Sequence, residues 1–331
     1  MESITFYGIT LSGQIYFIAF ICLAVLVFYT YTSFKKKKGK SFNSDASSLS
    51  SSLILTTPHT ICDSINCIRC SRNHEILQLA LTRLSYLSES DKYTKNDLKY
   101  LSKDIEKSLA CIKEKEKGLP SKKHDSSQHS TPAVFQMFGL KDQELWSIKD
   151  FPALQILNQH LYDITCEFQH LYDHFLTDET VWKVNSTNKG RWEIAHLINQ
   201  GHTTKVAEMC PVTYQILKKI PYFLDNNLFG DASYSVVHSG TDISTHCGST
   251  NIRLRCHFGL IVPPNECYLK VGEKICHWKE NQVLCFNDAY AHSVHHNGQK
   301  ASGMRVVFMF DIWHPDVTES QKQILNYAFS S

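Results

Sequence analysis

The residues best able to do chemistry are two histidines and an arginine in the C-terminal half of the chain. His246 lies just before Gly248, and His292 and Arg305 follow further along. Imidazole suits iron(II), and the arginine fork can hold the far carboxylate of a 2-oxoacid. Two histidines plus one carboxylate, with open positions, are typical of Fe(II) oxygenases, but here glycine occupies the third position. The alternatives are that the histidines are ordinary polar loop residues and that Arg305 reaches solvent from an edge strand.

A further basic group lies between these residues. Arg253, Arg255 and His257 alternate with apolar residues, and side chains at i and i+2 share one face of a strand. The three basic groups are therefore expected to face one way, either as an anion site or as a solvated outer face. His295 and His296 are further candidate metal ligands, because spacing alone does not single out His292.

Short β-type runs separated by turn residues are expected to position these side chains. The runs are Trp182–Asn185, Trp192–Ile198, Ser233–His238, Arg253–Val262, Cys267–Val271, Lys274–Trp278, Val283–Phe286, Ala291–Val294 and Arg305–Ile312. About eight short strands of this kind predict a β-sandwich or jelly roll. No glycine-rich phosphate loop joins a strand to a helix, which argues against a nucleotide-binding fold.

The N-terminal part predicts a membrane anchor. Residues 9–34 carry no charge and include a continuous apolar run from Ile15 to Phe28. A spanning helix needs about 20 such residues. Lysines follow from Lys35 onward, and the positive-inside rule places that flank in the cytosol. A cleaved signal peptide is the alternative, but it would need a basic n-region and a small-residue cleavage site.

A polar linker and a cysteine cluster come next. Cys62, Cys67, Cys70 and His74 could bind one zinc ion in tetrahedral geometry, or the cysteines could form disulfides or remain thiols. Residues 73–117 predict one or two amphipathic helices, and residues 152–175 predict a helix with apolar residues at three- and four-residue steps.

Four stretches in the C-terminal region resemble the aspartyl/asparaginyl β-hydroxylase domain. They are Ser235–Thr241, Thr245–Leu260, Phe286–His292 and Arg305–Pro315. With the N-terminal apolar segment and the cysteine cluster, the chain more narrowly resembles the aspartate β-hydroxylase domain-containing membrane proteins. The order and spacing of the four stretches make the likeness to the hydroxylase domain specific.

The resemblance implies a double-stranded β-helix that depends on Fe(II) and 2-oxoglutarate and hydroxylates a protein or peptide side chain, at the β-carbon of Asp or Asn. In the family, the histidines matching His246 and His292 hold iron, the usual acidic ligand is absent, and the arginine matching Arg305 binds 2-oxoglutarate. Three further residues match positions that line this co-substrate: Ser235, Arg255 and His257. The alternatives are a non-catalytic membrane-anchored binding protein with a degenerate oxygenase domain, and a zinc-organised adaptor.

The expected organisation follows from these readings. It comprises a tail at 1–8, a transmembrane helix at 9–34, a basic and Ser-rich linker at 35–60, the cysteine cluster and helical region at 61–135, and the oxygenase-like domain at 136–331. We expect a single-pass membrane protein of the secretory pathway: the lysines favour a cytosolic domain, whereas the family and the sequon at Asn185 favour a lumenal one. The net charge of +2 gives no reason to expect a nucleic-acid partner.

Overall fold

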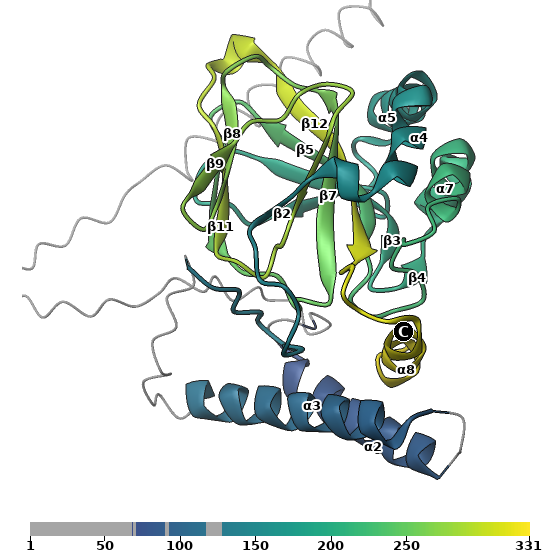
Figure 1. Ribbon diagram of the computed structural model, residues 1–331. Coiled ribbons are helices and arrows are strands. Elements are labelled where there is room, and N and C mark those ends of the chain that lie inside the picture. Colours follow the sequence, from purple (N-terminus) through teal and green to yellow (C-terminus); the bar gives the residue numbers. More distant parts are fainter. Residues whose placement is uncertain (1–67, 69–70, 90–92, 117–127) are drawn as a thin grey trace, which may run out of the picture. The chain divides into compact units, whose positions relative to one another are not determined.

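The computed structural model describes residues 68, 71–89, 93–116 and 128–331 (Figure 1). The strands of this part of the chain form two sheets in which neighbouring strands are antiparallel. The larger sheet has the order β1 (Leu145–Trp146), β10 (Val283–Phe286), β7 (Arg253–Ile261), β12 (Met304–Trp313), β5 (Ala232–His238), β3 (Trp192–Asn199) and β2 (Lys183–Asn185), with β4 (His202–Thr203) beside β3. The smaller sheet has the order β6 (Asp242–His246), β11 (His292–His296), β8 (Cys267–Val271) and β9 (Lys274–Cys276).

The alternation of side chains along the central strands explains why these sheets pack. On β12, Phe308 and Phe310 point to the helix-covered face, whereas Val307 and Met309 point to the smaller sheet. The apolar side chains of the smaller sheet, Leu269 among them, complete this inner cluster. β12 and its neighbours thus pack against helices on one face and face the smaller sheet on the other. The candidate site lies between the two sheets.

Helices cover the outer face of the larger sheet (Figure 1). The helical elements that follow β1 are η1 (Ile148–Asp150), η2 (Pro152–Gln155), α4 (Ile156–Gln159), α5 (Leu161–Phe175), α6 (Lys205–Met209), α7 (Pro211–Lys218), η3 (Lys300–Ser302) and α8 (Glu319–Ala328). Phe168 of α5 and Leu217 of α7 are fully buried against the larger sheet. The expected continuous helix at 152–175 is interrupted, because His160 adopts φ −115° and ψ 17°, outside the helical region.

The expected helical region consists of α2 (Asn73–Ser88) and α3 (Lys95–Glu116), which pack against each other. Leu84 of α2 and Leu101 of α3 share a buried cluster with Leu325 of α8. The mainly β architecture with flanking helices that the sequence predicts is therefore confirmed for the C-terminal region.

The expected localisation needs a correction. Among the described residues, no helix is both long and apolar enough to span a membrane. The longest, α3, has 22 residues, but lysine, aspartate and glutamate recur along it, and its apolar residues form only one stripe. This finding overturns the expectation of a single-pass membrane protein. Residues 9–34, on which the expectation was based, lie outside the described residues.

Candidate functional site

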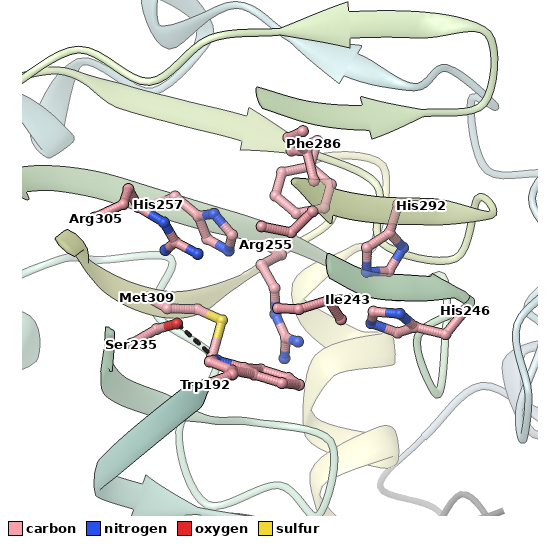
Figure 2. A pocket seen from close by; sticks show the side chains of 12 residues that line it. Trp192, Ser235, Ile243, His246, Arg255, His257, Phe286, His292, Arg305 and Met309 are labelled. Atoms are coloured by element: carbon pink, nitrogen blue, oxygen red, sulfur yellow. Dashed lines mark hydrogen bonds between the residues drawn. The ribbon is translucent and has the colours of Figure 1, made fainter. Parts of the chain in front are cut away.

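One pocket between the two sheets brings the candidate residues together (Figure 2). It encloses about 390 Å³ of empty space, open solvent at its mouth included. Its walls carry all six residues that the sequence suggests for metal and co-substrate: His246, His292, Arg305, Ser235, Arg255 and His257. Apolar side chains make up the rest of the lining, together with Trp192: Ile243, Leu269, Phe286, Val294 and Met309.

The two histidines face each other across neighbouring strands. His246 ends β6, His292 begins β11, and the two are direct partners in the strand register. Their ring centroids are 4.2 Å apart. The register shifts just after His292, at an irregularity of the kind that re-aims side chains. The pair is therefore close enough for both rings to contact one metal ion.

The hydrogen bonds of the two rings favour the tautomer that metal binding needs. Nδ1 of His246 lies 2.8 Å from the carbonyl of Ser244, and Nδ1 of His292 lies 2.9 Å from the carbonyl of Tyr290. A carbonyl can only accept, so each Nδ1 carries the proton and each Nε2 is the acceptor nitrogen. Within the described residues, no set of three or more His, Cys, Asp and Glu side chains converges as a metal site. The donor set is thus two imidazoles.

Arg305 is a buried cation at the opposite end of the pocket (Figure 2). Its side chain is 1% exposed, and its guanidinium lies 4.6 Å from the ring centre of Trp278. Neither its Nε nor its Nη1 has a hydrogen-bond partner in the part of the chain that the structure describes. Burial lowers the pKa of Arg305 to about 10. A buried charge with unused donors is costly unless a ligand supplies the partner.

His257 adds a neutral donor beside Arg305. Nε1 of Trp278 donates to Nδ1 of His257 at 3.1 Å, so the proton of the neutral ring is on Nε2. That Nε2 is buried and, among the described residues, has no partner. Burial lowers the pKa of His257 well below its usual value, and the nearby charges of Arg305 and Arg255 lower it further. Both groups therefore present unused N–H donors to the same end of the pocket.

Ser235 and Trp192 form part of the opposite wall. Nε1 of Trp192 donates to the Ser235 hydroxyl at 3.1 Å (Figure 2). Ser235 is 3% exposed and lies on β5, next to the strand that carries Arg305. Because the hydroxyl accepts from the indole, its own proton can point toward a ligand in the pocket.

The two arginines of β7 differ from Arg305, because protein carboxylates pair with them. Arg253 binds Asp288 at 2.7 Å and Asp311 at 2.8 Å. Arg255 binds Asp311 at 2.9 Å and lies 3.4 Å from Asp288. Burial alone would raise the pKa of Asp288, but the two arginines lower it below its usual value. The predicted shared face of β7 is present. The anions that its two arginines bind are carboxylates of the protein itself.

Gly248 is needed because Asp288 lies against it. A Cβ atom at position 248 would come within 2.4 Å of the Asp288 carboxylate. The backbone N–H of Gly248 also donates to the carbonyl of Asp288 at 2.6 Å. The acidic residue that the histidine motif lacks would have no room at position 248, because the carboxylate of Asp288, from the loop before His292, already occupies the space.

The remaining sequence-based candidates lie elsewhere. His295 pairs with Asp242 at 2.9 Å, and His296 accepts from the backbone of Gly298; neither lines the pocket. Asn185 lies on β2 with its side-chain nitrogen buried, and glycosylation there stays a prediction. Of the cysteine cluster, only His74 is described, at the start of α2; Cys62, Cys67 and Cys70 lie outside the described residues.

Sequence reasoning missed Asp288, Asp311 and Trp278 as parts of the site. Asp288 follows Asn287 in the stretch that leads to His292, and Asp311 shares a strand face with Arg305, so both carry a weak signal. Trp278 carried no such signal, because the residues that it contacts lie on strands far away in the sequence.

Comparison with known proteins identifies the family. Residues 158–315 match the family model described as aspartyl/asparaginyl beta-hydroxylase. Human aspartate beta-hydroxylase domain-containing protein 2 is 34% identical over 281 residues, which cover 83% of this chain and 72% of that protein. Human aspartyl/asparaginyl beta-hydroxylase is 36% identical over 201 residues, which cover 58% of this chain and 26% of that protein. The chain belongs to the aspartyl/asparaginyl β-hydroxylase family, and the resemblance seen in the sequence is confirmed.

The matches to solved structures are weak. A prolyl-4-hydroxylase from Pseudomonas putida matches with a TM-score of 0.31 and 9% identity, over 46% of this chain and 87% of that one. A predicted oxalate decarboxylase from Thermotoga maritima matches with a TM-score of 0.26 and 15% identity, over 40% of this chain and 92% of that one.

Proposed function

We propose that this protein is an Fe(II)- and 2-oxoglutarate-dependent dioxygenase that hydroxylates a side chain of a protein or peptide, at the β-carbon of Asp or Asn as the family name suggests. The proposed fold is the double-stranded β-helix typical of such enzymes. The observation that carries the proposal is the buried, unpaired Arg305 facing two imidazoles across one pocket. A structural arginine would have been expected to pair with a carboxylate, as Arg253 does.

The co-substrate fits the donors that the protein leaves unused. The far carboxylate of 2-oxoglutarate would accept hydrogen bonds from Arg305 and from Nε2 of His257. The hydroxyl of Ser235, which also lines the pocket, provides another donor. Trp278 stacks on Arg305 and binds His257, so one indole orients both groups. A dianion with its two ends apart satisfies these groups better than a monoanion.

The metal fits the two imidazoles at the other end. With their Nδ1 protons donated to carbonyls, His246 and His292 would hold iron(II) through Nε2. When bound there, iron(II) would supply the redox chemistry that couples oxidation of 2-oxoglutarate to hydroxylation of a substrate C–H bond. Water and the co-substrate would complete the coordination, since the protein offers no third ligand of these types among its described residues.

The rest of the pocket would orient and shield the reactants. Apolar side chains, such as Leu269 and Phe286, exclude water from the space between the two ends. The pairing of Arg255 with Asp311 fixes its guanidinium at the pocket wall. The carboxylate of Asp288 lies next to Gly248 and is held by Arg253, so it contributes fixed negative charge close to the histidine pair.

Turnover of the co-substrate tests the proposal. The full chain, supplied with Fe(II), 2-oxoglutarate and oxygen, should form succinate, and Asp- or Asn-containing peptides should stimulate it. His246→Ala should abolish both succinate formation and iron binding, whereas the matched control His295→Ala, on the same strand pair but outside the pocket, should retain them. Iron and 2-oxoglutarate binding without turnover would instead indicate a non-catalytic binding protein. The absence of both binding and turnover would refute the proposal.

A further inference from the structure

An irregular stretch at residues 130–138, here called the bracing segment, contacts both loops that adjoin the candidate metal ligands. On one side, the N–H of Ala133 donates to the carbonyl of Gly248 at 2.8 Å, and the N–H of Val134 donates to Ser249 at 2.9 Å. On the other side, the N–H of Thr131 donates to the carbonyl of Ala289 at 2.8 Å. One segment thus bonds to the loop after His246 and to the loop before His292.

The bracing segment is itself fixed through its C-terminal half. The side-chain amide of Asn251 donates to the carbonyl of Met137 and accepts from its N–H, each at 2.8 Å. The ring of Phe135 is fully buried, 5.0 Å from that of Phe329. Asn251 is 6% exposed, so these contacts are formed away from solvent.

Two side chains of α3 complete the attachment. The carboxylate of Asp104 accepts from the N–H of Phe138 at 3.0 Å, and the hydroxyl of Ser108 accepts from the N–H of Gln136 at 3.1 Å. Asp104 and Ser108 are 8% and 6% exposed, which is unusual for polar residues of a helix. They lie one turn apart on one face of α3. Neither residue was predicted from the sequence to have a role.

The sheet supports the two histidines unequally, since β11 pairs with β8 as well as with β6. β6 is the terminal strand of the smaller sheet, so His246 has a strand neighbour on one side only. The irregular register beside His292 removes part of the ladder at the point where the two rings meet. Metal affinity depends on ligands being pre-placed by surrounding hydrogen bonds.

We propose that the bracing segment, anchored by Asp104 and Ser108 of α3, holds the two ligand-bearing loops at the spacing required for His246 and His292 to bind one metal ion. The α2–α3 hairpin is then part of the metal site's support and not a separate module. Asp104 and Ser108 are positioning residues that act through the segment. The inference rests on the proposed function for the identity of the metal, but the pre-placement of the rings can be measured without it.

The test compares three variants of the full chain with the wild type. Asp104→Ala combined with Ser108→Ala removes both anchors, whereas Asp104→Asn retains an oxygen that accepts from Phe138. Leu84→Ala on α2 is the matched control, since it truncates a side chain that is 2% exposed in the same helical core without touching an anchor. ¹⁵N spectra of the imidazoles are recorded in the metal-free protein, and Co(II) binding is followed by visible absorption.

The expected result is specific to the anchors. The double variant should lose the uniform Nδ1–H tautomer of His246 and His292 and bind Co(II) about tenfold more weakly, as loss of supporting hydrogen bonds does at other metal sites. Asp104→Asn and Leu84→Ala should retain the wild-type tautomer and affinity, although Leu84→Ala lowers the melting temperature. Unchanged spectra in the double variant, or the same loss in Leu84→Ala, would overturn the inference. Failure of the wild type to bind Co(II) would count against the proposed function alone, because the metal-free spectra still decide this inference.

Discussion

Two groups of buried cations lie in the same fold, and their surroundings are opposite. Arg253 and Arg255 are held by Asp288 and Asp311, with distances from 2.7 to 3.4 Å. Arg305 is as buried as Arg253, but no carboxylate among the described residues forms an ion pair with it. The paired arginines complete the protein's own structure, whereas the unpaired one has donors that the described residues leave unused. Burial alone therefore does not identify a binding residue, whereas a buried cation that lines a pocket without an ion-pair partner is a candidate for one.

The largest expected effect comes from breaking the paired group. Arg253→Met removes a cation that contacts Asp288 and Asp311, and leaves two carboxylates short of a partner. Breaking a buried ion pair from one side costs about 3–5 kcal/mol, so the free energy of unfolding should fall by that amount. Urea denaturation monitored by tryptophan fluorescence measures it. A fall below about 1 kcal/mol would mean that this network contributes little to the fold.

The same substitution at the unpaired cation should have the opposite sign. At neutral pH Arg305 is charged in both the folded and unfolded states, and its pKa of about 10 means that folding is penalised for burying that charge. Arg305→Met should therefore raise the free energy of unfolding by roughly 1–3 kcal/mol, since one pKa unit corresponds to about 1.4 kcal/mol. The same urea experiment, without ligand, measures this. Destabilisation as large as that of Arg253→Met would remove the contrast.

A third substitution, at Gly248, tests how tightly Asp288 and its arginine partners are packed. Gly248→Ala would place a methyl group within 2.4 Å of the Asp288 carboxylate, which the arginines hold in place. Overpacking of this kind costs about 1–3 kcal/mol. Thermal unfolding should show a lower melting temperature than in the neighbouring control Ser249→Ala. Equal melting temperatures would show that Asp288 can move away.

The neutral state of His257 predicts a pH dependence. Its pKa is well below the usual value in the folded protein, so the unfolded chain takes up a proton below about pH 6.5 that the folded protein does not. Stability should therefore fall as pH decreases from 7 to 5, by up to about 1.4 kcal/mol per pH unit from this residue. His257→Gln should show a shallower fall across this window in urea denaturation. Parallel curves of unfolding free energy against pH for the variant and the wild type would mean that His257 is also protonated in the folded protein.

The smallest change separates two roles of Trp278. Trp278→Phe keeps an aromatic ring over Arg305 but removes the N–H that donates to His257. Loss of one hydrogen bond of this kind costs about 1 kcal/mol, so the dissociation constant for 2-oxoglutarate should rise about fivefold. Trp278→Leu should raise it further by removing the ring as well. Calorimetric titration compares the two; equal values would assign no role to the indole N–H.

The sequence predicted the parts of the site that depend on local alternation. Cys267–Val271 and Val283–Phe286 were predicted with the bounds that β8 and β10 have. The shared face of Arg255 and His257 followed from the two-residue repeat of β7, whose intervening residues, such as Cys256, are buried on the other face.

Other parts could not be predicted, because they depend on contacts between distant segments. β6, which carries His246, has a single apolar residue, Ile243, and so lacks a strand signal. Spacing could not choose His292 over its neighbours His295 and His296; the fold makes this choice by pairing His292 with His246. The carboxylates that neutralise Arg253 also come from separate strands and loops, so the sequence could not distinguish a paired arginine from an unpaired one.

Binding of 2-oxoglutarate is the most direct test of the idea that the unpaired cation marks a ligand site. Calorimetric titration of the Co(II)-loaded full chain should give a dissociation constant that rises at least about thirtyfold in Arg305→Met, because truncating one partner of a buried charge pair costs 2 kcal/mol or more. The variant should meanwhile remain folded and at least as stable as the wild type. Equal affinity in Arg305→Met and the wild type would contradict the account.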